Sequence, residues 1–233
     1  MDVKVDDGRR QAVKNGMYFV CMGLSLEIVS LIAEGIITDD TIFIGRVVRI
    51  ISIAAFGGQF WGFLKLSGVS NYYRRAKEMT LAAIILLSGM LLFDVLTLKN
   101  AGVEEILTGS AYASTIVVIL VVSMLEIFIN KYLLYGNAEI AREEGDDALA
   151  EKFMRLWRNF IVATVMLIIV SIAMLGAILA LAYGYFAQMN DVLLTGGIVW
   201  VLSGESLIAF SLIYIASYIR IIINTGRLYS KFS

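Results

Sequence analysis

Six long apolar stretches, separated by short polar segments, constrain the fold of this chain more than any other feature. They lie at about 16–36, 44–66, 79–96, 112–134, 160–182 and 197–223. A helix needs about 20 apolar residues to cross a hydrocarbon core of about 30 Å. The chain contains no proline, the residue that most often breaks a helix. The sequence therefore predicts an all-α integral membrane protein, a bundle of six transmembrane helices arranged as three helical hairpins.

The composition points to the same environment. Hydrophobic residues make up 59% of the chain and charged residues 17%, whereas soluble domains average about 45–50% and about 25%. A soluble domain of this composition would have too few polar side chains to cover its apolar core. We therefore expect the lipid bilayer as a partner and a multi-pass location in the cell membrane, in a prokaryotic plasma membrane.

The lysines and arginines predict how the chain is oriented. Sixteen of the 19 lie before the first apolar stretch, after the second, between the fourth and fifth, or after the last. Alternate connections therefore carry nearly all the positive charge, and positive residues stay on the cytoplasmic side. Both termini are predicted to be cytoplasmic.

The same pattern divides the chain into segments. Residues 1–15 are predicted to form a cytoplasmic N-terminal segment, and residues 16–233 a single transmembrane domain. Residues 136–159 are predicted to form a cytoplasmic helical connection, acidic in its first half and basic in its second. Two interpretations of this connection stay open: two membrane helices that protrude and join near Gly145, or a docking surface for a soluble partner.

Several kinds of chemistry are excluded by the residue types. The chain has no histidine and one cysteine, Cys21, so it cannot supply a histidine-based triad, a His/Cys zinc site or an internal disulfide. The basic residues are spread over the predicted inner connections and form no nucleic-acid binding stripe. We expect no enzymatic activity, no cofactor, no metal site and no nucleic-acid partner.

Ionisable residues inside the apolar stretches are the functional candidates, because a charge there costs several kcal/mol unless it faces protein or water. A rise of about 1.5 Å per residue places several of them in the outer leaflet, where opposite charges can pair. The predicted outer ion cluster consists of Glu34, Arg46, Arg49 and Asp94, with Glu205 at a similar depth. The intramembrane acidic candidates are Glu27, Glu126 and Glu205.

The neighbours of two of these acids predict which way they point. Glu27 shares a helix face with Gly16, Gly23 and Ser30, and Glu126 shares one with Thr115, Ser123 and Asn130. Faces of small and polar residues suit contact with another helix better than contact with lipid. Both acids are therefore expected to face the bundle interior or another subunit, where hydroxyl and amide groups can bind them.

Small residues at helical spacing predict close helix packing. The two sets are Ala54, Gly58 and Gly62 in the second stretch, and Gly176, Ala180 and Gly184 in the fifth. Both contacts within the chain and a seam between two copies are consistent with this pattern. Gln59, next to Gly58, could hydrogen-bond across such a contact.

Two functional interpretations follow from these residues. In the first, the chain translocates an ion or solute through its intramembrane carboxyl groups. In the second, it is a non-catalytic structural or accessory subunit of a membrane complex, which docks a partner through its helices or through residues 136–159. A homo-oligomer is compatible with either.

Overall fold

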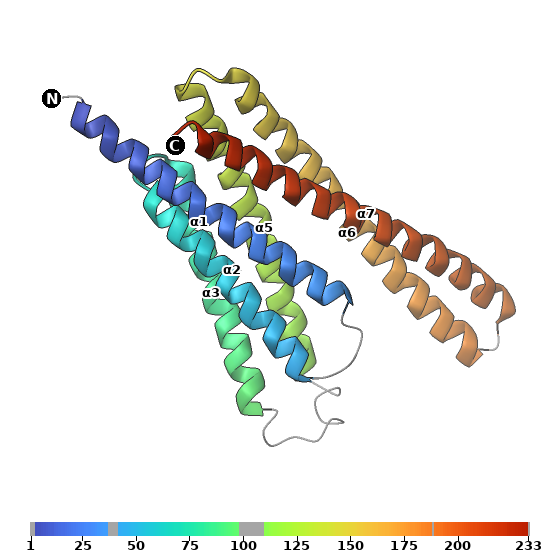
Figure 1. Cartoon of the computed structure of the whole chain (residues 1–233). Coiled ribbons are helices and arrows are strands. Elements are labelled where there is room, and N and C mark those ends of the chain that lie inside the picture. Colours follow the sequence, from blue (N-terminus) through green and yellow to red (C-terminus); the bar gives the residue numbers. More distant parts are fainter. Residues whose placement is uncertain (1–2, 37–41, 98–109, 188, 233) are drawn as a thin grey trace. The chain divides into compact units, whose positions relative to one another are not determined.

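The computed structural model describes residues 3–36, 42–97, 110–187 and 189–232, and within these residues every element is a helix. The helices are α1 (Val3–Ile36), α2 (Ile42–Leu66), α3 (Asn71–Thr97), α5 (Ser110–Glu143), α6 (Asp147–Ala187) and α7 (Asn190–Ser230) (Figure 1). Each of the six contains a stretch long and apolar enough to cross a membrane. The prediction of an all-α, multi-pass membrane protein is confirmed. The orientation, with both termini cytoplasmic, stays a prediction.

The helices are longer than the apolar stretches that predict them. α6 and α7 each run for 41 residues, about 60 Å at the usual rise per residue. This is twice the thickness of a hydrocarbon core. The chain has no proline to break these helices, and they continue through the charged residues at their ends.

The chain forms two compact units, and the prediction of a single transmembrane domain from residue 16 onward stays a prediction. The first unit comprises Met1–Met154 and Ile221–Ser233, and the second comprises Arg155–Arg220. α6 and α7 therefore each contribute to both units.

The first unit is built from adjacent helix pairs. α1 packs on α2, α2 on α3, and α3 on α5, and Figure 1 shows these four helices side by side. The ends of α6 and α7 that belong to this unit contribute Phe153 and Leu228 to its core. Its largest fully buried aliphatic and phenylalanine side chains are Met17, Leu24, Phe63, Leu66, Ile129, Leu133, Leu134, Ile140 and Phe153.

A tight turn joins α5 to α6. Gly145 adopts a positive φ of 75°, a conformation that glycine reaches without steric cost. Its N–H donates to the carbonyl of Arg142, and the N–H of Asp146 donates to that of Ala141, a pattern that ends many helices. The Asp146 carboxylate then accepts from the N–H of Leu149 at 2.9 Å and caps α6. Two helices thus join at Gly145 in the predicted 136–159 connection.

The second unit is the antiparallel hairpin of α6 and α7. Aromatic rings hold one end of it, because Phe160 lies 5.2 Å from Tyr214 and 5.8 Å from Tyr218 between ring centroids. Near the turn, Gly184 and Leu193 are in close contact. Most apolar side chains of the hairpin are exposed, as expected for helices that lipid surrounds.

Candidate functional site

Glu27 lies in the contact between α1 and α2. We call the residues from Gly16 to Ser30 and from Val48 to Leu66 the α1–α2 seam. Its side chain is 7% exposed and accepts a hydrogen bond from Nε2 of Gln59 at 2.5 Å. Gln59 is itself buried. A buried carboxyl group needs such a partner, because a polar group removed from water without one costs several kcal/mol. The expectation that Glu27 faces another helix and binds an amide there is confirmed.

Glycines bring the two helices together on one side of this pair. A Cβ atom at Gly23 would lie 2.6 Å from the carbonyl oxygen of Ala55 and from the backbone nitrogen of Gln59. A Cβ at Gly62 would lie 2.6 Å from the carbonyl oxygen of Gly16. Only glycine permits such an approach of backbone to backbone. The contact lies within the chain.

The remaining members of the predicted α2 motif differ in their surroundings. Gly58 is buried, and a Cβ there would lie 3.2 Å from the Cα of Gly23. Ala54, by contrast, is exposed. The α1–α2 seam therefore uses two of the three predicted small residues, Gly58 and Gly62, together with glycines of α1.

On the other side of Glu27 the seam is polar. Ser30 is 3% exposed, and its hydroxyl lies 2.7 Å from that of Ser52 across the two helices. Ser52 also donates to the carbonyl of Val48 at 3.2 Å. In α1 the seam thus carries glycines before Glu27 and a hydroxyl group after it.

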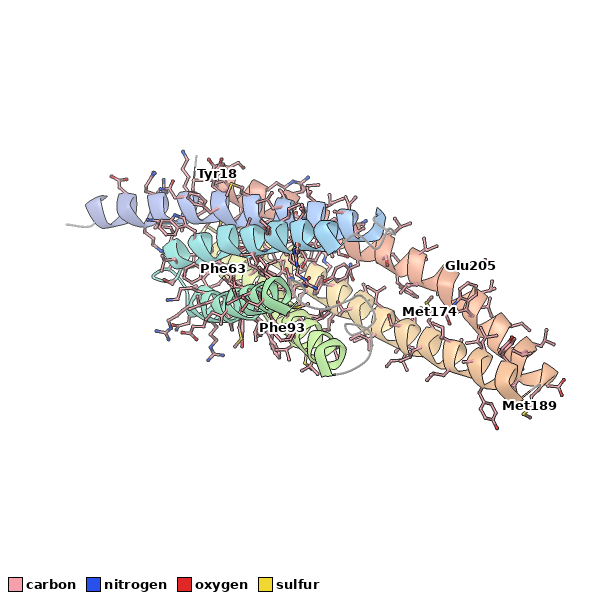
Figure 2. The ribbon with its side chains drawn as sticks, turned by 90° about the horizontal axis from the view of Figure 1, so that it is seen from below. Tyr18, Phe63, Phe93, Met174, Met189 and Glu205 are labelled. Atoms are coloured by element: carbon pink, nitrogen blue, oxygen red, sulfur yellow. The ribbon has the colours of Figure 1, made fainter. Side chains whose placement is uncertain are left out.

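The other two acidic candidates lie elsewhere. Glu126 is half-buried on α5, and Nδ2 of the buried Asn130 donates to its backbone oxygen at 3.1 Å. Glu205 is exposed on α7, well along the hairpin from Met189 (Figure 2). Its carboxyl group has no hydrogen bond or ion pair with a residue that the structure describes. Glu27 and Glu126 thus lie on different helices of the first unit, and Glu205 belongs to the second unit.

The predicted outer ion cluster stays a prediction. Arg46 and Arg49 are half-buried near the start of α2. The side chains of Glu34 and Asp94 lie outside the described residues, so the structure does not test whether they meet these arginines.

Two of the three predicted small residues of α6 line a groove in the hairpin. Gly176 and Ala180 face Thr195 and Val199 of α7 across an open groove of about 520 Å³. Gly184 is buried closer to the turn, where a Cβ would lie 3.1 Å from the backbone nitrogen of Leu193. These residues therefore pack α6 on α7 at the turn and leave a hollow farther along.

A buried polar network, which sequence reasoning missed, joins three helices of the first unit. The Tyr73 hydroxyl donates to Oδ1 of Asn137 at 2.7 Å, and Nδ2 of Asn137 donates to the Thr225 hydroxyl at 2.9 Å. All three side chains are fully buried. Gly136 makes room for the ring, because a Cβ there would lie 2.7 Å from Cζ of Tyr73. We call these three residues the tyrosine–asparagine–threonine network.

Two ion pairs lie at helix ends of the first unit. Arg9 of α1 pairs with Glu143 at the end of α5. Lys231, just after α7, lies 2.5 Å from a carboxylate oxygen of Asp146. The amine and the N–H of Leu149 both donate to that carboxylate and hold the pKa of Asp146 below its usual range.

Comparison with protein-family models, with curated proteins and with solved structures finds no match to this chain.

Proposed function

We propose that this multi-pass membrane protein is not an enzyme and moves protons or small cations, with Glu27 as the group that binds them. The observation that carries the proposal is the buried Glu27 carboxyl group, hydrogen-bonded to Gln59 inside a pair of membrane-length helices. Ionisable groups at such positions are rare and are commonly found on ion or proton pathways.

The unequal halves of the α1–α2 seam support a direction of access. On one side of Glu27 the seam carries the hydroxyl groups of Ser30 and Ser52, which are hydrogen-bonded to each other and can relay a proton. On the other side Gly23 and Gly62 bring the backbones into close contact. By the predicted orientation the polar half faces outside. An ion would therefore enter from outside and leave only when the glycine contacts open.

Flux measurements on the full chain in sealed vesicles test this proposal. Glu27→Gln keeps the shape of the side chain and a hydrogen-bonding partner for Gln59, but it cannot exchange a proton. We expect it to abolish a flux driven by H⁺, Na⁺ or K⁺ gradients. Gln59→Leu should reduce the flux less, because the carboxyl group remains. Glu126→Gln and Glu205→Gln test whether these acids are further steps.

The matched control is Glu78→Gln, which removes an exposed carboxylate from α3 near its predicted cytoplasmic end. It should leave the flux unchanged. The proposal is wrong if the parent protein carries no flux under any of the three gradients, or if Glu27→Gln is as active as the parent.

A second candidate function, an accessory subunit of a membrane complex, is favoured by Glu205. This carboxyl group is exposed midway along a membrane-length helix without a described partner, and lipid is a costly environment for it. A helix of another membrane protein that carries a basic or amide side chain would bind it. In this case a stable partner should co-purify with the parent protein, and Glu205→Leu should release it.

A further inference from the structure

Cations and tyrosine rings meet on one face of the α3–α5 pair. The Arg75 guanidinium lies over the ring of Tyr132, 5.9 Å from its centroid, and the Lys131 amine lies over Tyr135 at 6.0 Å. Tyr72 lies against Tyr135 with 5.6 Å between ring centroids. We call these five residues the tyrosine–cation cluster. Two helices contribute to it, so it exists only in the folded chain.

The two cations of this cluster differ from others in the first unit. Arg9 and Lys231 each bind a carboxylate. Arg75 and Lys131 form no ion pair with a residue that the structure describes. Each cation lies over the face of a tyrosine ring, which attracts it weakly. Its N–H groups are available to an anion.

The position of the cluster identifies the kind of anion. Lys131, Tyr132 and Tyr135 lie around residue 134, where the fourth apolar stretch ends on its predicted cytoplasmic side. Arg75 is exposed, and Lys131 and the three tyrosines are half-buried. Tyrosine and basic side chains at this level contact lipid headgroups, and basic pockets between membrane helices bind the headgroups of anionic lipids.

We propose that the tyrosine–cation cluster binds the phosphate headgroup of an anionic phospholipid. Arg75 and Lys131 approach the phosphate from α3 and α5, respectively. The rings of Tyr132 and Tyr135 hold the two cations in place, and Tyr72 closes the side of the cluster. The acyl chains then follow the apolar α3–α5 surface into the membrane. This inference is independent of any role of Glu27.

Lipid binding to the detergent-purified full chain tests the proposal, with phosphatidylglycerol and phosphatidylcholine as probes and native mass spectrometry as the measurement. Phosphatidylglycerol should be retained in preference to phosphatidylcholine. Arg75→Gln and Lys131→Gln should each weaken its binding about fivefold, the usual effect of one basic residue at a membrane surface. Arg75→Lys, which keeps the charge, should bind nearly as the parent does.

The matched control is Arg74→Gln. Arg74 is the exposed neighbour of Arg75, and the structure gives it no ring contact or ion pair with a described residue. It should retain phosphatidylglycerol as the parent does. Tyr132→Phe keeps a ring face and should bind normally, whereas Tyr132→Leu should not.

Three results would overturn the proposal. Equal losses in Arg74→Gln and Arg75→Gln would mean that the positive charge acts diffusely, without a site. Equal retention of the two lipids would exclude selectivity for an anionic headgroup. Displacement of phosphatidylglycerol by millimolar inorganic phosphate would identify the ligand as a free phosphate ion.

Discussion

The α1–α2 seam and the α6–α7 hairpin both contain small residues at helical spacing, yet they use them differently. In the seam, Gly23 and Gly62 bring two backbones into contact beside the buried Glu27. In the hairpin, Gly176 has open space around it and Glu205 is exposed. Small residues therefore permit close packing without requiring it. Whether a polar side chain becomes buried depends on the residues of the opposite helix, as Gln59 shows for Glu27.

The largest expected effect comes from filling one glycine of each region. Gly23→Ile places its side chain against the backbone of Ala55 and Gln59 and should destabilise the fold by about 1–3 kcal/mol, because well-packed helices cannot accommodate the added volume. Gly176→Ile enters open space and should change stability by less than about 0.5 kcal/mol. Unfolding in mixed micelles, followed by circular dichroism, measures both. Equal effects would mean that the two regions are packed alike.

A smaller effect is expected from the tyrosine–asparagine–threonine network. Asn137→Leu keeps the branched shape of the side chain but leaves the hydroxyl groups of Tyr73 and Thr225 buried without their partner. The cost should be about 1–2 kcal/mol, since hydrogen bonds between membrane helices contribute modestly. Thr195→Val in the hairpin is the control, because the exposed hydroxyl of Thr195 donates to its own helix, at the carbonyl of Asp191, and to no other residue that the structure describes. If both variants unfold alike, burial does not distinguish the units.

Much of the α1–α2 seam was predictable from local sequence. The seven-residue spacing of Gly16, Gly23 and Ser30 places them on the face of Glu27, and Gln59 stands beside the Gly58–Gly62 motif. Helical periodicity predicts that these faces avoid lipid. The apolar length of the six stretches likewise predicted six helices, and one interpretation of residues 136–159 was two helices that protrude and join near Gly145.

The rest depends on which helices meet, and one sequence does not encode that in its periodicity. Tyr73 and Asn137 are 64 residues apart, and Asn137 and Thr225 are 88 apart. Each stands at a helix end where basic and aromatic residues are common in any membrane protein, so no local signal distinguished them. The direction of Glu205 was equally obscure, because both small and large residues share its face.

The smallest expected effect concerns the ion pair of Lys231 and Asp146, which links the end of α7 to the start of α6 within the first unit. Because this pairing lowers the pKa of Asp146, its contribution to stability is complete above the ordinary value of 3.8 and disappears as the pH falls through the lower folded-state value. Lys231→Gln should therefore melt slightly below the parent near neutral pH, and the difference should vanish well below pH 3.8. Arg227→Gln removes a charge from the same end of α7 without touching Asp146, and should show no such pH dependence. A Lys231→Gln deficit that persists in acid would mean that the lysine stabilises the fold through packing of its aliphatic chain, and that the ion pair with Asp146 contributes nothing.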